Sequence, residues 1–394
     1  MADISILYDR SETDELGIRL TAEHMGIDLG YLPFHKAAVG FSNSGFSYRS
    51  VGKDYTDALK ETRVVLNRTQ SKSRRIFGTT ILEALDVDVL NPLTIEMSCQ
   101  SKIRTLLALY REGIRIPATV YVSCNAMETA TTGMQVDNRG VVADLIEGQL
   151  GEGKIVIKPD AGTHGKGVSL VDGHDQLVEK LGETSSSIIN PSGVVAQEFI
   201  PKWFYDLRII VEKEKGKNGN CIPTALVRGG FKEFRTNTFL GNMVFRVELP
   251  EIVRREAVRC GEVLAGDADA WVLALDAMPY IGNDKTADED ELKKYFDALE
   301  EPFEEVKKVK ADQMKLRRFK EYSKRIEEAY NGYMATEAYA FIQGVIQESL
   351  DGKRDTVLFH EGNSCPEFWE QTRIVGGANV AESLLRSAQS LLDR

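Results

Sequence analysis

The segment Ile155–Val168, which reads IVIKPDAGTHGKGV, combines residue types that could bind a phosphate group. The β-branched run at its start favours a buried strand, so Lys158 would emerge from a sheet at a fixed point. The loop that follows contains three glycines and a second lysine, Lys166. Glycines let backbone N–H groups approach phosphate oxygens and lysine supplies the countercharge, although neither a Walker A motif nor G-x-G-x-x-G is present. Taken alone, the segment fits either a phosphate-binding loop or a glycine-rich turn with a surface lysine.

Two apolar strands in the second half of the chain lead into side chains that carry oxygen ligands. Asp276 follows the run Trp271–Leu275, and Glu361 and Asn363 lie two residues apart in a strand that begins at Val357. Residues at that spacing share one face of a strand. If the two strands pair, the two carboxylates and the amide form an all-oxygen set that suits Mg²⁺. A surface pair of acids is the alternative, which the preceding apolar strands disfavour.

Three further features lie between these motifs. The segment Gln197–Ile200 is either a strand whose backbone pairs with adenine or a plain core strand. Asp206 and Arg208 are two residues apart, which places an acid and a base on one face of a strand. Basic and amide residues are dense from Arg228 to Thr238, beside a glycine pair, and this density favours anion binding over isolated surface arginines.

A basic run occupies residues 68–75 and carries four positive charges in eight residues: Arg68, Lys72, Arg74 and Arg75. One interpretation is a solvated loop. The other is a docking site for an acidic acceptor, such as a carrier protein or a polypeptide that ends in glutamate. Local charge of this kind can recruit an acidic partner even to a chain whose net charge is −11.

Length and composition exclude several classes of protein. The 394 residues predict two or three domains, and the net charge of −11 argues against general nucleic-acid binding. No apolar run approaches the ~20 residues that span a bilayer, and the first residues lack the pattern of a signal peptide. The five scattered cysteines lack C-x-x-C spacing, which argues against a zinc site and for a reducing cytoplasm.

The coarse order of elements suggests where these motifs lie. Strands at 4–8, 63–67 and 87–90 alternate with helical stretches, which predicts a small parallel α/β domain. The segment 281–352 is dense in charged residues but has apolar residues at helical spacing, from Leu292 to Tyr330. Its charged faces predict an exposed helical hairpin, rather than buried core, that contacts a partner or a second subunit.

The order of the motifs resembles that of the ATP-grasp carboxylate–amine ligases, in the RimK-like branch, and most of all the LysX-type ligases that act on an amino-group carrier protein. The resemblance covers essentially the whole chain except about 281–352. It rests on Ser101–Arg104, Lys158 with its loop, Gln197–Ile200, Asp206–Arg208, Arg235–Gly241, Asp276, Glu361, Asn363 and Glu367-Phe368.

The resemblance implies an α/β (α+β) chain with the ATP-grasp fold. Its expected parts are an N-terminal parallel α/β pre-ATP-grasp domain at 1–95, a central subdomain with the glycine-rich loop at 96–200, and a C-terminal subdomain at 201–394. The last part would carry the metal site and the inserted helical element at about 281–352.

The resemblance also implies roles for single residues. The residues expected to bind ATP are Lys102, Lys158, Gly162, Thr163, His164, Gly165, Lys166, Gln197, Glu198, Phe199, Ile200 and Asp206. Those expected to ligate Mg²⁺ are Asp276, Glu361 and Asn363. Those expected at the phosphates and the acylphosphate are Arg208, Arg228, Arg235 and Asn237. Those expected to contact the substrates are Arg68, Lys72, Arg74, Arg75, Thr238 and Glu367.

The implied activity is ATP-dependent formation of an amide through an acylphosphate, with two Mg²⁺ ions, or Mn²⁺ in their place. The expected substrates are an amino acid and an acidic carboxylate acceptor, a terminal glutamyl group of a small carrier protein or peptide. Two alternatives are a glutamate ligase that modifies a small cofactor or a ribosomal tail, and a non-enzymatic ATP-binding scaffold. We expect a cytoplasmic homo-oligomer that contacts neither nucleic acid nor membrane.

Overall fold

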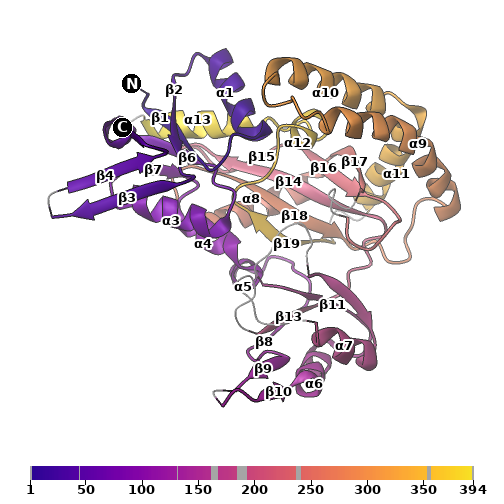
Figure 1. The fold of residues 1–394 in the computed structure, drawn as a ribbon. Coiled ribbons are helices and arrows are strands. Elements are labelled where there is room, and N and C mark those ends of the chain that lie inside the picture. Colours follow the sequence, from indigo (N-terminus) through magenta and orange to yellow (C-terminus); the bar gives the residue numbers. More distant parts are fainter. Residues whose placement is uncertain are drawn as a thin grey trace.

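The computed structural model describes residues 2–43, 45–130, 132–160, 167–183, 193–236, 241–352 and 356–392. Figure 1 shows a large upper body, which contains both ends of the chain, and a smaller lobe below it. No helix among the described residues is long and apolar enough to cross a membrane.

The N-terminal part is built on a parallel sheet in the order β2-β1-β6-β7, as the alternating pattern predicts. Its strands are β1 (Ile4–Tyr8), β2 (Leu29–Pro33), β6 (Val64–Asn67) and β7 (Asp88–Leu90). Its helices are α1 (Thr13–Met25), α2 (Thr56–Glu61), α3 (Lys72–Glu83) and α4 (Leu93–Gln100). The C-terminal helix α13 (Val380–Leu392) packs against α1 and β6, so the end of the chain covers the first sheet.

A small antiparallel sheet interrupts this parallel pattern and was not predicted. It consists of β3 (Ala37–Ser42), β4 (Gly45–Ser50) and β5 (Lys53–Asp54), and it projects from the upper body in Figure 1. Glycine and serine interrupt the apolar residues of β3 and β4, so their sequence shows no clear strand pattern.

The smaller lobe contains an antiparallel sheet in the order β12-β11-β13-β8. Its strands are β8 (Thr119–Val122), β11 (Lys154–Lys158), β12 (Ser169–Asp172) and β13 (Val194–Glu198), with the small pair β9 (Met127–Thr129) and β10 (Gln135–Asp137). Helix α5 (Lys102–Arg111) leads into it, and α6 (Arg139–Leu150) and α7 (His174–Leu181) cover one face. Ile155 and Ile157 are buried in the core that these two helices share. Val156 and Lys158 alternate with them and therefore face the other side.

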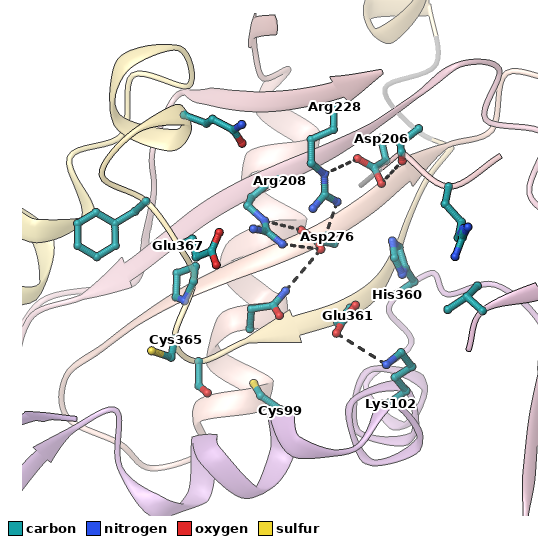
Figure 2. A pocket seen from close by; sticks show the side chains of 18 of the residues that line it. Cys99, Lys102, Asp206, Arg208, Arg228, Asp276, His360, Glu361, Cys365 and Glu367 are labelled. Carbon is teal, nitrogen blue, oxygen red and sulfur yellow. Dashed lines mark hydrogen bonds and ion pairs between the residues drawn. The ribbon is translucent and has the colours of Figure 1, made fainter. Parts of the chain in front are cut away.

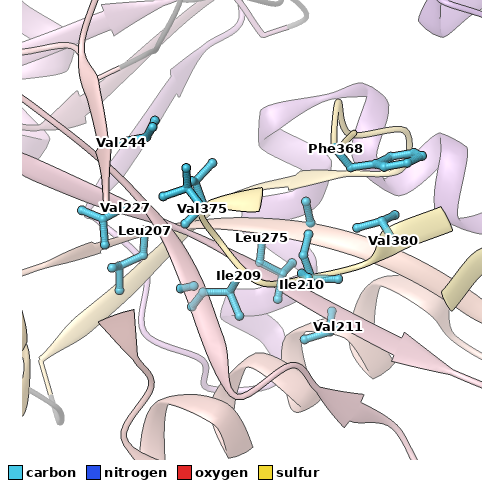
Figure 3. Packing of buried hydrophobic residues seen from close by; sticks show 14 of the residues in the cluster. Leu207, Ile209, Ile210, Val211, Val227, Val244, Leu275, Phe368, Val375 and Val380 are labelled. Carbon is cyan, nitrogen blue, oxygen red and sulfur yellow. The ribbon is translucent and has the colours of Figure 1, made fainter. Parts of the chain in front are cut away.

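The central sheet has the order β17-β16-β14-β18-β19, with β15 paired to β14, and every printed pairing in it is antiparallel. Its strands are β14 (Tyr205–Lys213), β15 (Asn220–Cys221), β16 (Thr224–Gly229), β17 (Met243–Glu248), β18 (Trp271–Pro279) and β19 (Val357–Asn363). Leu207, Ile209 and Val211 alternate with Asp206 and Arg208 along β14, and Figure 3 shows the apolar set within the core. Helix α8 (Glu251–Ala265) packs on the apolar face and α12 (Gln371–Ile374) lies near β16. The opposite face carries the polar residues and forms part of the cavity.

The segment 281–352 is helical, but its predicted form and environment are wrong. It forms three helices rather than a hairpin: α9 (Glu289–Lys310), α10 (Phe319–Met334) and α11 (Glu337–Gly352). Leu292, Leu299 and Val306 of α9 are fully buried in the main core of the chain. The reason is that the stripe carries large aromatic side chains in addition to aliphatic ones. Such an apolar area is stabilised more by packing on the sheet than by exposure on a hairpin.

Helix α11 also covers the outer edge of the central sheet. The backbone of Arg246 in β17 donates to the Tyr339 hydroxyl at 3.0 Å, and its carbonyl accepts from Gln343 Nε2 at 2.8 Å. Gln347 Oε1 accepts from the backbone N–H of Glu248 at 2.8 Å, and Gln347 Nε2 donates to the Glu248 carbonyl at 3.0 Å. Side chains of the insertion thus take the place of a neighbouring strand.

A Phe296→Ala variant should test the burial of the insertion through the free energy of unfolding. Phe296 packs against Phe204, Phe231 and Phe245, with ring centroids 5.5 to 5.7 Å apart. We expect a loss of about 3–5 kcal/mol in chemical denaturation, the usual cost of truncating a buried phenylalanine. The matched control is Phe77→Ala in α3, where the side chain is 66% exposed, and a change below about 0.5 kcal/mol is expected. Equal effects of the two variants would contradict a buried insertion.

Candidate active site

A cavity of about 820 Å³ lies where the smaller lobe, the central sheet and the N-terminal part meet. The predicted site residues that line it are Arg68, Lys72, Arg75, Lys102, Lys158, Gln197, Glu198, Phe199, Ile200, Asp206, Arg208, Arg228, Arg235, Asp276, Glu361, Asn363 and Glu367. The predicted residues that lie outside the described part of the chain are Gly162, Thr163, His164, Gly165, Lys166, Asn237 and Thr238. Residues from the whole length of the sequence therefore meet in one space.

Lys158 and Lys102 form a cationic end of the cavity. Lys158 Nζ donates to Gln197 Oε1 on the neighbouring strand β13, and Gln197 Nε2 donates to Thr119 at 2.8 Å. Burial, together with the charge of Lys102, lowers the pKa of Lys158 to about 7. Because burial makes the charged form of Lys158 unfavourable, an anion bound beside it would stabilise that form.

Asp160, two residues after the end of β11, fixes these two lysines relative to one another. Asp160 Oδ1 accepts from the Ser101 hydroxyl at 2.8 Å and from the Ile103 backbone N–H at 2.9 Å. The Asp160 carbonyl also accepts from the backbone N–H of Lys102 at 3.0 Å. The start of α5 is therefore tied to the end of β11, and Lys102 is held on the same side of the cavity as Lys158.

A row of ion pairs crosses the polar face of the central sheet (Figure 2). Register places Arg208 of β14 opposite Asp276 of β18, and Asp276 opposite Glu361 of β19. Arg208 binds Asp276 through two N–H groups at 2.9 and 3.0 Å, and Arg228 approaches the same carboxylate at 3.2 Å. Arg228 also donates to Asp206 at 2.8 Å. Burial opposes ionisation of Asp276, but the two arginines outweigh it and hold its pKa well below the ordinary value.

The structure shows why Glu361 and Asn363 share the cavity face. Gly362 between them points the other way, where an added Cβ would lie 2.8 Å from Leu264 and 3.1 Å from Cys99. A larger residue between the two polar residues would therefore require these buried side chains to shift. Glu361 Oε1 lies 3.9 Å from Lys102 Nζ. Burial would raise the pKa of Glu361, yet Lys102 and Lys72 lower it.

The donor set fits a magnesium ion in its chemistry. Asp276 and Glu361 carry carboxylates on paired positions, and Asn363 lies at 3.5 Å from Asp276 through its amide nitrogen. Among the described residues, no group of three or more histidines, cysteines and acids could hold a metal ion. The candidate set contains two acids and one amide instead, and hard oxygen donors of this kind are what Mg²⁺ takes.

The basic run 68–75 is not an exposed patch, so its interpretation as a solvated loop is wrong, whereas its interpretation as a docking site for an acidic acceptor stays a prediction. Arg68 and Arg75 are 6% and 5% exposed. Arg68 contacts Asp14 at 3.1 Å, and Arg75 contacts Glu96 at 3.0 Å. These partners come from α1 and α4, which the local sequence does not reveal.

The other two basic residues of the run differ from each other in exposure. Arg74 alone is exposed; it contacts Asp9 at 2.8 Å and does not line the cavity. Lys72 begins α3 and donates to the Cys99 carbonyl at 3.1 Å. Contact between a substrate and Arg68, Lys72 or Arg75 stays a prediction.

Sequence reasoning missed several residues of the cavity. Lys202 contacts Asp206 at 3.8 Å, and burial lowers the pKa of Lys202 to about 8. His360 lies at a bulge in β19, and burial with the nearby Lys158 charge lowers its pKa to about 4, so it is neutral. Lys310 and Lys315 come from the insertion. Neither spacing nor residue type set these lysines apart from the many others of the chain.

Nucleotide binding should make the protein take up protons at pH 8. The pKa of Lys158 is about 7 in the free protein, so most of its ammonium groups are deprotonated at pH 8. A triphosphate beside it would raise that pKa again, and protons would move from buffer to protein. Calorimetric titration with ATP in two buffers of different ionisation enthalpy should show uptake of about half a proton or more. A Lys158→Met variant should lose this proton uptake. Equal binding heats in both buffers for the unmodified protein would contradict this assignment.

Comparison with known proteins agrees with this geometry. Residues 130–276 match the family described as "Prokaryotic glutathione synthetase, ATP-grasp domain". The alpha-aminoadipate–LysW ligase LysX of Sulfurisphaera tokodaii is 24% identical over 222 residues, which are 56% of this chain and 70% of that protein. The glutamate–LysW ligase ArgX of the same organism is 25% identical over 218 residues, which are 54% of this chain and 68% of that protein. The crystal structure of D-cycloserine synthetase DcsG superimposes with a TM-score of 0.55 at 12% identity, over 99% of both chains.

The structural likeness shows that the chain has the ATP-grasp fold, and residues 130–276 match an ATP-grasp domain. The predicted fold class is therefore confirmed. Its relatives are ligases, and the chain is an ATP-dependent ligase that is similar to LysX and ArgX. The domain boundaries expected at residues 95 and 200 stay a prediction.

Proposed function

We propose that this protein joins the amine of an amino acid to the terminal glutamyl carboxylate of a carrier protein or peptide. The observation that carries the proposal is that one continuous cavity contains both groups of cations. The cavity joins the Lys102–Lys158 end, which suits a triphosphate, to the arginine row on β14 and β16. Support for the acceptor comes from LysX and ArgX, whose names give LysW as the protein they act on.

The reaction would proceed in two steps. The acceptor carboxylate attacks the γ-phosphorus of ATP, an O–P bond forms, and ADP leaves. The amine nitrogen then attacks the acyl carbon, the C–O bond to phosphate breaks, and phosphate leaves as the nitrogen loses a proton. Neither step needs a nucleophilic side chain, so the protein acts by positioning the reactants and by stabilising charge.

Each part of the site has a role in this scheme. Lys102 and Lys158 bind the phosphates, and Gln197–Ile200 holds the adenine. Arg208 and Arg228 face the group being transferred. Asp276, Glu361 and Asn363 would hold Mg²⁺, which when bound supplies positive charge to the phosphate oxygens.

Trapping with hydroxylamine tests this function. The protein is incubated with ATP, Mg²⁺, hydroxylamine and one acceptor at a time: a small carrier protein ending in glutamate, a glutamate-terminated peptide, and free glutamate. An acylphosphate gives a hydroxamate together with ADP, and we expect both with the carrier or the peptide. A protein that binds ATP but releases no ADP with any acceptor would instead be a scaffold, and the proposal would fail.

A further inference from the structure

The insertion forms one wall of the active-site cavity. Lys310, at the end of α9, and Lys315, in the turn before α10, line it together with Glu370 and Gln371. This end of the cavity lies beside α12 and the start of α1. Figure 1 shows α10 and α12 well apart from β11, the strand that carries Lys158.

Several contacts hold this wall in place. Glu370 accepts from the Tyr322 hydroxyl at 2.5 Å and contacts Lys310 Nζ at 2.9 Å. Arg325 contacts Asp312 at 2.8 Å, which fixes the turn to α10. The rings of Phe319 and Trp369 pack with centroids 5.6 Å apart. These contacts hold the turn in place as part of the cavity wall.

The cations at this end differ in their partners. Arg68 contacts Asp14 and Glu15, and Lys310 contacts Glu370. Lys315 Nζ donates to the Lys310 carbonyl at 3.1 Å and lies 5.7 Å from the centre of the Tyr322 ring. Within the described parts of the chain, no carboxylate lies within 4.0 Å of the Lys315 ammonium. A partly buried charge without a counterion favours an anion that enters the cavity.

We propose that Lys315 binds a carboxylate group of a substrate and thereby selects acidic substrates. This inference rests on the proposed ligase function and assigns part of the substrate specificity to the insertion. The carboxylate belongs either to an acidic amino acid that supplies the amine, or to an acidic side chain that flanks the activated group of the acceptor. The chemistry of recognition is the same for both, an ammonium with a carboxylate.

Steady-state kinetics of Lys315→Ala test the inference. We use L-glutamate and L-2-aminoadipate as amines and a glutamate-terminated carrier protein as acceptor. We expect the KM of one acidic substrate to rise roughly 10- to 100-fold, as for a lost charge-assisted hydrogen bond, with kcat and the KM for ATP nearly unchanged. Lys315→Arg should restore most of the affinity. The matched control is Lys324→Ala in α10, where an exposed lysine contacts Glu328 and does not line the cavity.

A second assay with hydroxylamine as the amine distinguishes the two sources of the carboxylate. If Lys315 binds the acceptor, the acceptor KM rises in both assays. If Lys315 binds the amino acid, the acceptor KM in the hydroxamate assay is that of the unmodified protein. Unchanged KM values for both acidic substrates in an active variant would overturn the inference while the ligase function stands. An unmodified protein that gives neither ADP nor hydroxamate would overturn both.

Discussion

A Glu361→Gln variant should fold normally and lose nearly all turnover. The substitution keeps the shape of the side chain but removes its charge, and Glu361 is one of the two carboxylates that would hold Mg²⁺. We expect ADP release to fall roughly 10²- to 10³-fold, the range for losing one group that stabilises charge in a transition state. Turnover is measured by coupled ADP detection over a range of Mg²⁺ concentrations.

The control for this variant is Glu300→Gln in α9, which removes an exposed carboxylate that contacts Lys232 at 3.1 Å. Its turnover and its melting temperature should match those of the unmodified protein. If Glu361→Gln retains activity within about threefold of the unmodified protein, Glu361 does not belong to the metal-binding set.

Arg228→Met should cost more stability than any exposed substitution. Arg228 is 6% exposed and bridges Asp206 and Asp276, whose charges outweigh burial and raise its pKa. Without it, two buried carboxylates lose a shared cation, and removing one partner of a buried ion pair typically costs about 3–5 kcal/mol. Chemical denaturation at pH 7 measures the free energy of unfolding.

Two further variants separate the loss of charge pairing from the loss of packing. Arg228→Met combined with Asp206→Asn should recover part of the stability, because one of the unpaired charges is removed as well. Arg386→Met in α13 breaks an exposed pair with Glu382 and should change the free energy of unfolding by less than about 0.5 kcal/mol. A double variant as unstable as the single one would show that the charges of Asp206 and Arg228 are not coupled.

The sequence predicts most of what lies along single strands of this protein. Apolar runs that end in a polar residue located β11 with Lys158 and β18 with Asp276. Two-residue spacing placed Glu361 and Asn363 on one face. These predictions depend on alternation within a strand, which a linear sequence records directly.

What the sequence does not predict depends on contacts between distant segments. The burial of Arg68 and Arg75 depends on acids contributed by α1 and α4, so a run of charges looked exposed when read by itself. The bulge at His360 depends on the register between β18 and β19. The cavity position of Lys315 depends on how the insertion folds back over the site, and nothing in its local sequence differs from that of other lysines.

The edge contacts between α11 and β17 have a consequence for how this chain could be shortened or recombined. A version without residues 283–352 would present the outer strand of the central sheet with its N–H and C=O groups unsatisfied, beside an opened hydrophobic core. Such a strand is a template for pairing with any extended chain, including a second copy of itself. We therefore expect a truncated chain to self-associate or aggregate rather than remain a soluble minimal ligase. Strand β17 and the three helices would have to be transferred into another ligase together, as one unit.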